Sequence, residues 1–277
     1  MTQFRADIII IGGGNMGSAM AHGLLINPDL KIVILTNTPS KCSLYICENP
    51  NIYVTDDIKN ISLSQNACCI LAVKPYAIQS VIGQYADILK QCDMVVSVAA
   101  GISYHALQGW AWALDIQSKI IRAMPNLPVA FGTGLIGYYA PEPSSVFQNL
   151  FSRCGQIIYL KHEYDMHAFT ALAGSGPAFL FHFMESLAIA GEKIGLSTDL
   201  SAMIARNMVI GASDYARHHG NIGADILRQN VTSPAGTTFA GLTELIGQDI
   251  NPHQSHLTDL LMKTLSAAQK RSLELAE

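Results

Sequence analysis

Three glycines near the start of the chain are spaced as in a loop that binds a dinucleotide. Gly12, Gly14 and Gly17 form the pattern Gly-x-Gly-x-x-Gly after a short apolar run at residues 8–11. In such a loop the first glycine allows a tight turn, the second lets the backbone approach a pyrophosphate, and the third lets helix and strand pack closely. Free N–H groups at the helix start then bind the anion. A purely structural turn is the alternative, but the strand–turn–helix context favours a dinucleotide site.

The segment after the second apolar run indicates which dinucleotide is bound. NAD-preferring sites place Asp or Glu there to bind the ribose hydroxyls, whereas residues 36–41 contain no carboxylate. Asn37 and Thr38 can donate hydrogen bonds, and Lys41 adds a positive charge that suits a 2′-phosphate. We therefore expect NADPH, with NADH as the alternative cofactor. The competing interpretation is that these residues only form a turn.

Other candidate residues follow predicted strands or interrupt a predicted helix. Lys74 and Asn126 each follow an apolar run, and ligands bind beyond the carboxyl ends of strands in open α/β sheets. A lysine at a strand end can equally be a solvated tip. Residues 174–177 read Gly-Ser-Gly-Pro and break a helical pattern, because Pro177 lacks an N–H. They are either a turn between helices or a wall of a substrate pocket.

The elements that would position these residues change character in the middle of the chain. Up to about residue 160, short β-branched runs alternate with helical patterns at residues 18–26 and 78–89. The runs lie at residues 8–11, 32–35, 69–73, 94–98, 120–123 and 157–160. Those that lack polar alternation should be buried on both faces, as in a parallel sheet.

Only helical patterns follow residue 162. They cover residues 164–172, 178–194, 199–218, 222–228, 237–246 and 253–276. We therefore expect an α/β protein with two domains. Residues 1–162 would form a Rossmann-like dinucleotide-binding domain, and residues 163–277 would form an all-α domain.

Composition narrows the classes of partner. Hydrophobic residues make up 49% of the chain and charged residues only 14%, which suggests that another subunit covers some apolar surface. The net charge is −4 and no Lys/Arg run occurs, so nucleic acid and anionic membrane are poor partners. The longest apolar helical stretch, residues 178–190, falls short of the roughly 20 residues that span a bilayer. No signal peptide precedes it, so we expect a cytoplasmic protein.

The six cysteines and nine histidines do not suggest a metal site. No Cys-x-x-Cys pair occurs, and no Cys/His set has the spacing of zinc ligands. We expect reduced, buried thiols and no bound metal.

Six further motifs, taken in chain order, resemble the pyrroline-5-carboxylate reductase family over essentially the whole chain. The most specific is Thr-Ser-Pro-x-Gly-Thr-Thr. The motifs are Ala-Val-Lys-Pro at 72–75, Ser-Val-Ala-Ala-Gly-Ile at 97–102, Arg-Ala-Met-Pro-Asn-Leu-Pro at 122–128, Ala-Gly-Ser-Gly-Pro-Ala-Phe at 173–179, Val-Thr-Ser-Pro-Ala-Gly-Thr-Thr at 231–238 and Arg-Ser-Leu-Glu-Leu at 271–275.

The resemblance implies an enzyme that reduces 1-pyrroline-5-carboxylate to L-proline with NAD(P)H, the last step of proline biosynthesis. It also implies that the helical domain dimerises and that dimers assemble further, commonly into decamers. The implied cofactor contacts are Gly12, Gly14, Asn15, Met16, Gly17, Asn37, Thr38, Lys41, Ala72, Val73, Lys74, Pro75 and Ala99. The implied substrate contacts are Gly176, Ser233, Gly236, Thr237 and Thr238.

The residues near Thr238 suit that substrate chemically. A helix pattern starts at Gly236, so free N–H groups and the positive end of the helix dipole could hold a carboxylate without Lys or Arg. Thr238, or a water that it holds, could then hydrogen-bond the ring nitrogen. The competing interpretation is simple capping, because Ser233 and Thr237 are good N-cap residues in any protein.

Three positions depart from the usual family pattern. Gly17 stands where alanine is frequent, which we expect to change little. Thr38 stands where many members have arginine, which weakens the NADPH assignment. Ala235 replaces a usual glycine, so we expect a backbone conformation there that accepts a Cβ.

Two other functions fit the same architecture. A reductase of another cyclic imine, or a β-hydroxyacid dehydrogenase, is the nearer one. β-Hydroxyacid dehydrogenases usually carry a lysine on the long helix of the second domain, and here Lys193 lies only at the far end of that helix. A non-catalytic NADP(H) sensor is the alternative of a different class, but it would have no reason to keep Thr237 and Thr238.

Overall fold

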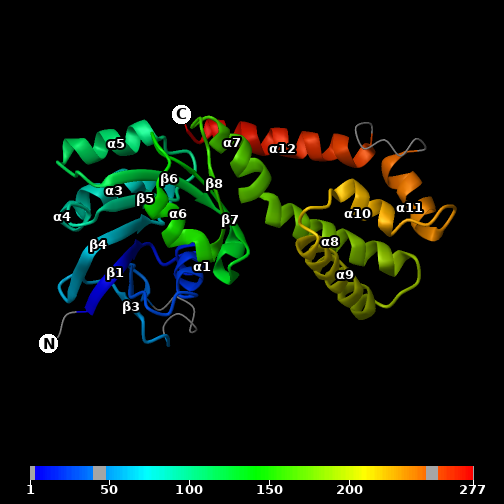
Figure 1. Ribbon diagram of the computed structural model, residues 1–277, viewed down its shortest axis with the longest axis horizontal. Coiled ribbons are helices and arrows are strands. Elements are labelled where there is room, and N and C mark those ends of the chain that lie inside the picture. The colour runs from blue at the N-terminus through cyan, green and yellow to red at the C-terminus, as the bar shows by residue number, and fades with distance from the viewer. Residues whose placement is uncertain (1–3, 40–47, 248–254, 277) are drawn as a thin grey trace. The chain divides into compact units, whose positions relative to one another are not determined.

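The computed structural model describes residues 4–39, 48–247 and 255–276, which form two compact units (Figure 1). The first unit comprises Met1–Ser175 together with Ala268–Glu277, and the helical unit comprises Gly176–Ala267. The domain boundary that the sequence suggests, between residues 162 and 163, stays a prediction.

The first unit contains one eight-stranded sheet. Six strands are parallel, in the order β3 (Ile52–Thr55), β2 (Ile32–Leu35), β1 (Phe4–Ile11), β4 (Ile61–Leu71), β5 (Met94–Ser97) and β6 (Lys119–Pro125). β7 (Gly134–Tyr139) joins β6 antiparallel, and β8 (Gly155–Tyr159) pairs with β7 in parallel. The expected parallel sheet is confirmed, with a reversed pair of strands added at one edge.

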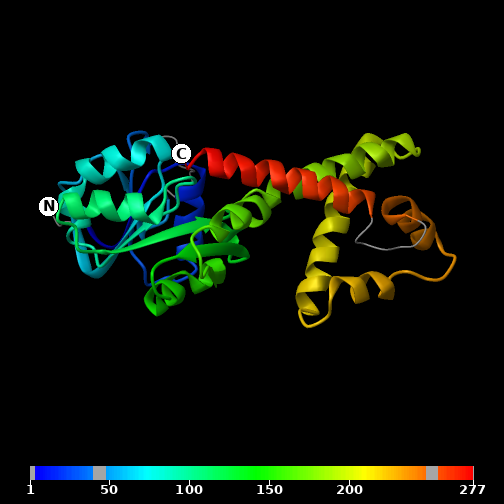
Figure 2. The same ribbon diagram turned by 90° about the horizontal axis from the view of Figure 1, so that it is seen from above.

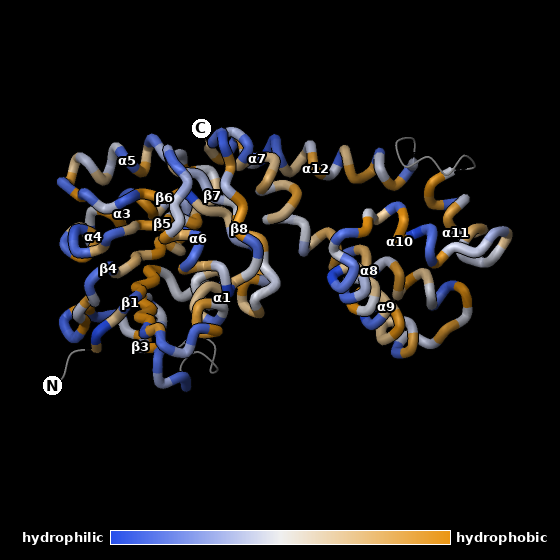
Figure 3. Tube along the Cα trace, viewed as in Figure 1, coloured by the Kyte–Doolittle hydropathy of each residue, from blue (hydrophilic) through white to orange (hydrophobic). Residues whose placement is uncertain are grey.

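Helices cover both faces of this sheet, and the core lies in two layers. Alternate strand residues such as Ile8 and Ile10 pack with α1 (Asn15–Leu24) and α6 (Ser145–Phe151) on one face. Their neighbours Ile9 and Ile11 pack with α3 (Ile78–Gln84), α4 (Ala86–Leu89) and α5 (Tyr104–Ala113) on the other. In Figure 3 the apolar colour is accordingly strong along most of β1. Burial on both faces explains why these strands lack polar alternation.

The structure adds details that the pattern did not indicate. The predicted helix over 78–89 is broken at Tyr85, where φ −113° and ψ 24° leave the helical region. β4 begins earlier than expected and contains a bulge, because Asn66 adopts φ 66° and the register with β1 shifts between Ala6 and Ile8. The described part of the first unit also contains the short 3-10 helices η2 (Pro75–Ala77), η3 (Leu127–Phe131) and η4 (Ser152–Cys154).

The predicted break at residues 174–177 is confirmed. α7 (Asp165–Phe169) continues into a π turn at Thr170–Gly174, in which the Ser175 N–H donates to the Thr170 carbonyl at 2.9 Å. α8 (Gly176–Lys193) then starts the helical unit, with Pro177 in its first turn, where a missing N–H is tolerated.

The helical unit is built around a tight pair of helices. α9 (Thr198–His218) packs on α8 so closely that a Cβ placed on Gly191 would lie 2.9 Å from the Ser201 Oγ. α10 (Ala224–Asn230), α11 (Thr237–Ile246) and the first part of α12 (His256–Glu274) follow. Among the described residues, no helix combines the length and the apolarity needed to cross a bilayer.

Candidate active site

The glycine turn joins β1 to α1 with very close backbone contacts. Gly12 has φ 115°, and a Cβ there would lie 2.5 Å from the Ala72 carbonyl oxygen at the end of β4. A Cβ on Gly17 would lie 1.9 Å from the Gly12 carbonyl oxygen. The expectation that alanine at 17 changes little is therefore wrong for this backbone, because the turn would have to move.

Gly14 differs from these two glycines in that its surroundings are open. A Cβ on Gly14 would meet no atom within 4 Å. Gly14 is the N-cap of α1, and no side chain caps the helix. Asn15 is exposed and Met16 is half-buried. The start of α1, which no side chain caps, therefore presents the positive end of the helix dipole beside the open space at Gly14, which suits a pyrophosphate.

The ends of β2 and β4 adjoin this turn in the sheet. The Gly12 N–H donates to the Leu35 carbonyl at 2.9 Å, and the Ala72 N–H donates to the Ile11 carbonyl at 2.8 Å. Asn37 and Thr38, just beyond β2, are exposed, whereas Lys41 lies outside the described residues.

Beyond β4, Val73 and Pro75 are half-buried and the Lys74 side chain is exposed. Ala99, two residues after β5, is buried, and its N–H lies 3.4 Å from the Ser97 Oγ. Only the backbone of Ala99 is therefore available for a contact. The predicted cofactor residues within the described ranges thus all lie at the carboxyl edge of β1, β2, β4 and β5.

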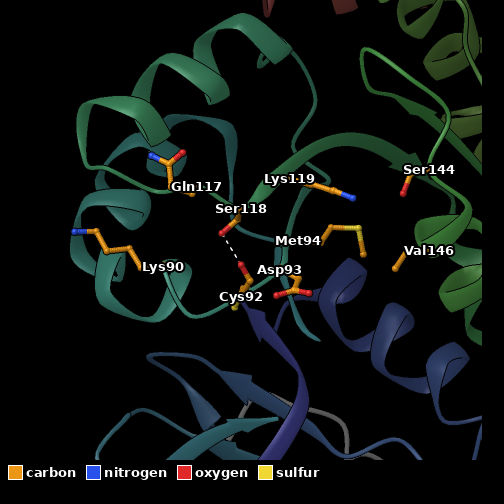
Figure 4. Close-up of a pocket in the computed structure, with 9 residues that line it drawn as sticks. All are labelled: Lys90, Cys92, Asp93, Met94, Gln117, Ser118, Lys119, Ser144 and Val146. Carbon is orange, nitrogen blue, oxygen red and sulfur yellow. Dashed lines mark hydrogen bonds between the residues drawn. The ribbon is translucent and has the colours of Figure 1, made fainter. Parts of the chain in front are cut away.

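A pocket at the opposite edge of the sheet does not belong to this site. It has a volume of about 340 Å³ and lies where β5 and β6 begin, near Met94 and Lys119 (Figure 4). The Ser118 hydroxyl bonds the carbonyls of Leu89 and Cys92, at 2.7 and 2.6 Å. Ligands of open α/β sheets bind beyond the carboxyl ends of the strands, so this pocket is remote from the dinucleotide edge.

The side chain of Asn126 is bonded within the protein and is not open to solvent. It is buried, its amide nitrogen donates to the Ala173 carbonyl at 3.1 Å, and its amide oxygen accepts from the Leu135 N–H at 2.9 Å. These bonds tie the end of β6 to β7 and to the π turn. The buried Asn126 side chain is therefore not a solvated tip, and these bonds favour a structural role over a ligand contact.

A buried polar cluster that the motifs did not reveal lies beside the end of β6. Arg122, 2% exposed, bonds the Glu163 carboxylate at 2.6 Å, and the same carboxylate oxygen accepts from the Tyr104 N–H at 2.6 Å. His167 is buried nearby, and its pKa is lowered by burial and then by the Arg122 charge. An arginine inside an apolar strand was the one sequence signal for this cluster.

The predicted substrate segment forms the start of α11 in the helical unit. Gly236 is the N-cap, with φ −81° and ψ 177°, and no side chain caps the helix. The capping interpretation of Ser233 and Thr237 is therefore not realised. Thr237 and Thr238 are exposed, and the described residues supply no hydrogen-bond partner for the Thr238 hydroxyl. The helix start is thus a free donor site for an anion.

Two other residues of the helical unit bear on the predictions: Ala235 is a departure from the family pattern, and Gly176 is a predicted substrate contact. Ala235 adopts φ 54°, in the left-handed region that glycine occupies at lower cost, so the expected accommodation of its Cβ comes with strain. Gly176 opens α8, and a Cβ there would meet nothing within 4 Å. A side chain would therefore fit at 176 without a clash.

Comparisons with known proteins agree along the whole chain. Residues 163–275 match the family model for pyrroline-5-carboxylate reductase dimerisation, and residues 7–101 match the model described as NADP oxidoreductase coenzyme F420-dependent. Pyrroline-5-carboxylate reductases from Pisum sativum and Pseudomonas aeruginosa are each 32% identical to this chain. The alignments cover 96% and 98% of this chain and 94% and 97% of those proteins.

Solved structures give the same result. A pyrroline-5-carboxylate reductase from Coxiella burnetii has a TM-score of 0.80 at 31% identity, over 98% of this chain and 99% of that one. The Plasmodium falciparum pyrroline carboxylate reductase, crystallised with NADP bound, has a TM-score of 0.75 at 25% identity, over 99% of this chain and 100% of that one. With near-complete coverage and identity above 30%, the chain belongs to the pyrroline-5-carboxylate reductase family of NAD(P)H-dependent oxidoreductases.

Proposed function

We propose that this chain reduces 1-pyrroline-5-carboxylate to L-proline with NADPH, and that Thr238 hydrogen-bonds the ring nitrogen of the substrate. The observation that carries the assignment of Thr238 is the uncapped start of α11, where this hydroxyl is exposed and has no partner among the described residues. Membership of the reductase family supplies the reaction.

The free N–H groups at the start of α11 bind the substrate carboxylate. They supply hydrogen bonds and the positive end of the helix dipole, so no lysine or arginine is needed. Gly236 lets the Ser233 hydroxyl lie close to this helix start, since a Cβ at 236 would lie 2.4 Å from the Ser233 Oγ. Ser233 and Thr237 line the same helix start.

Thr238 then orients the imine. Its hydroxyl, directly or through one water, hydrogen-bonds the ring nitrogen and keeps the C=N carbon in the position needed for reduction. When bound at the glycine turn, the dinucleotide supplies the hydride that this carbon accepts. The exposed Asn37 and Thr38, together with Lys41, favour NADPH because no carboxylate repels the 2′-phosphate.

An assay of cofactor oxidation with 1-pyrroline-5-carboxylate tests the reaction, and two threonine variants test the role of Thr238. Thr238→Val keeps the volume but loses the hydroxyl. A hydrogen bond to a charged group contributes about 1.5–3 kcal/mol, so kcat/KM at saturating NADPH should fall about ten- to a hundredfold. Thr243→Val is the control, because that hydroxyl on the same helix only donates to the Phe239 carbonyl. Full activity of Thr238→Val would show that Thr238 only packs.

The choice of cofactor has its own test. The ratio of kcat/KM for NADPH to that for NADH should exceed one, and Lys41→Glu should lower it by placing a negative charge near the 2′-phosphate. A clear preference of the unchanged protein for NADH would contradict the assignment while leaving the reaction intact.

The alternative activities are separated by the same assay. A reductase of another cyclic imine would oxidise NADPH with its own ring and not with 1-pyrroline-5-carboxylate. A β-hydroxyacid dehydrogenase is disfavoured because Lys193 is the last residue of α8. A non-catalytic NADP(H) sensor would bind the cofactor and oxidise none of it.

Self-association follows from the dimerisation model that the helical region matches. Assembly of dimers into decamers, and a cytoplasmic location, are finer proposals. The four described cysteines are free and buried, and burial raises the pKa of Cys92 and Cys154 to about 12. Such thiols stay protonated and inert, which is what a reducing compartment leads one to expect.

A further inference from the structure

The C-terminal end of α12 belongs to the first unit and not to the helical one. Residues Ala268–Glu277 cluster with Met1–Ser175. Both views place the end of α12, drawn in red, beside the sheet of the first unit (Figures 1 and 2). We call residues 268–276 the tail segment. It contains the Arg-Ser-Leu-Glu-Leu motif at 271–275, to which the reaction assigns no role.

One anchor of the tail segment is Ser272. Its side chain is 5% exposed, and its Oγ lies 3.0 Å from Nδ1 of His167 on α7. Ser272 is the buried residue of α12, whereas its neighbours Arg271 and Glu274 form an exposed ion pair. An exposed ion pair of this kind adds little to stability, so the buried Ser272 hydroxyl is the specific polar contact of the tail segment.

The second anchor is a backbone contact with the turn after β5. Gly101 has φ 81°, and a Cβ built on it would lie 2.3 Å from the Leu275 carbonyl oxygen and 2.7 Å from its carbonyl carbon. Only a glycine therefore lets the tail segment lie this close. Ala99, a proposed cofactor contact, lies in the same turn and is reached through its backbone.

From these two anchors we infer that the tail segment positions the turn at residues 99–101 for the cofactor, with Ser272 as its positioning residue. The inference rests on the proposed binding of NADPH at the carboxyl edge of the sheet. A docked tail covers one side of the turn and restricts its backbone, so the cofactor meets a contact surface that is already ordered. By linkage, if docking of the tail favours NADPH, then NADPH favours docking of the tail by the same factor.

Amide hydrogen exchange of the full-length protein, with and without saturating NADPH, measures that linkage. The amides of Leu275 and Ala276 donate to the carbonyls of Arg271 and Leu273 within the tail segment, so their exchange reports how often this segment opens, which docking restricts. NADPH should slow exchange in residues 268–276 at least about threefold, and it should also slow exchange in residues 12–20. Protection of the glycine turn alone would overturn the role of the tail and keep the cofactor site. Protection of neither segment would overturn both.

Two variants test the anchors separately. Ser272→Ala removes one neutral hydrogen bond, which should speed tail exchange about two- to twelvefold. The KM for NADPH should rise in the same direction, while kcat at saturating NADPH changes less than about twofold. Ser266→Ala is the control, an exposed serine on the same helix.

Gly101→Ala acts on the other anchor and should raise the KM for NADPH at least about tenfold. Gly109→Ala is its control, because Gly109 lies in α5 and a Cβ there meets nothing within 4 Å. A KM for NADPH that is unchanged in both Ser272→Ala and Gly101→Ala would overturn the inference, whatever happens to the Tm. Such a result would mean that the tail only stabilises the fold.

Discussion

The two units of the chain bury their apolar side chains in different ways. In the first unit, helices cover both faces of the sheet and the strand residues are buried. In the helical unit, α8 contains no buried residue, and α9 buries only Ser201, Ala205 and Val209. The exposed apolar residues of these two helices include Leu180, Phe181, Phe183, Ile189, Met203, Ile204, Met208 and Ile210.

This contrast shows which unit can complete its core alone. Monomeric proteins rarely expose apolar patches of this kind. The first unit closes its core within one chain, whereas the apolar helices of the second require a second chain, as the match to a dimerisation model indicates. On α8, Phe179 and Leu187 are half-buried, whereas Leu180 and Phe183 are exposed.

The largest expected effect comes from substitutions that disrupt the expected dimer interface of the helical unit. Ile204 and Met208 are 44% and 46% exposed on α9. Full burial of such a side chain contributes about 1.5–3 kcal/mol. About half of each side chain is left to bury, which contributes about 0.75–1.5 kcal/mol per residue. Two residues from each of two chains then contribute at least about 3 kcal/mol, so Ile204→Glu with Met208→Glu should weaken the dimer at least roughly a hundredfold.

Sedimentation equilibrium measures that change, and Arg206→Glu is the control because Arg206 is an exposed charged residue of the same helix. Unchanged dimer affinity in the double variant would place the interface elsewhere. A stable, active monomer of the unchanged protein at micromolar concentration would contradict the conclusion that the helical unit requires a second chain.

The next effect distinguishes a glycine needed for packing, Gly17, from one needed for cofactor binding, Gly14, within the first unit. Gly17→Ala forces a Cβ to within 1.9 Å of the Gly12 carbonyl oxygen, so it should lower the free energy of unfolding by about 1–3 kcal/mol and weaken NADPH binding. Gly14→Ala meets open space, so it should leave the Tm unchanged and weaken NADPH binding alone. Urea unfolding and cofactor titration distinguish the two. Equal Tm losses would mean that Gly14 is also a packing residue.

A pH effect should be smaller and confined to the first unit. Burial and the Arg122 charge lower the pKa of His167 from 6.5. The unfolded chain therefore takes up this proton near pH 6.5, whereas the folded protein does so only at lower pH. Stability from this group is full above pH 6.5 and is lost as the pH falls below it.

His167→Gln should reduce the loss of Tm between pH 7.5 and pH 5.5. Glu163, which bonds Arg122, and Ser272, which bonds His167, are present in both proteins. The matched variant His162→Gln changes an exposed histidine. An identical pH dependence in the unchanged protein and in His167→Gln would exclude His167 as its source.

The smallest effect belongs to the helical unit. Ala235 adopts φ 54°, a conformation that costs a residue with a Cβ about 1–2 kcal/mol. Glycine avoids this strain but loses about 0.5–1 kcal/mol in chain entropy. Ala235→Gly should therefore raise the free energy of unfolding by up to about 1.5 kcal/mol, which urea denaturation can measure. A decrease would show that the Ala235 methyl group makes a contact that offsets the strain.

The sequence predicted those parts of the fold that depend on burial along one segment. Residues 8–11, 32–35 and 94–97 are short, β-branched and buried on both faces, so their pattern is unambiguous. β3 is a short strand at the edge of the sheet, and β7 contains two glycines, so both patterns are weak. The reversal of β7 against β6 depends on tertiary pairing, which no local pattern encodes.

In the candidate site, too, local motifs could be predicted from the sequence, whereas contacts between distant residues could not. The glycine turn and the start of α11 are local motifs, and the chain places both as expected. The Arg122–Glu163 pair and the contact between Ser272 and His167 join residues far apart in the chain. Such contacts exist only once the strands and helices have packed, so residue spacing could not reveal them.

The return of the chain to the first unit has a consequence for how the protein is made. Residues 268–276 complete the first unit, but they leave the ribosome only after the helical unit between Gly176 and Ala267 has emerged. Contacts of such long sequence separation form slowly, because closing a long loop is entropically unfavourable. During synthesis the turn at Gly101 therefore lacks its Leu275 contact. A nascent chain would acquire a complete dinucleotide unit only as a late step of folding, after its dimerisation surface is already exposed to other chains.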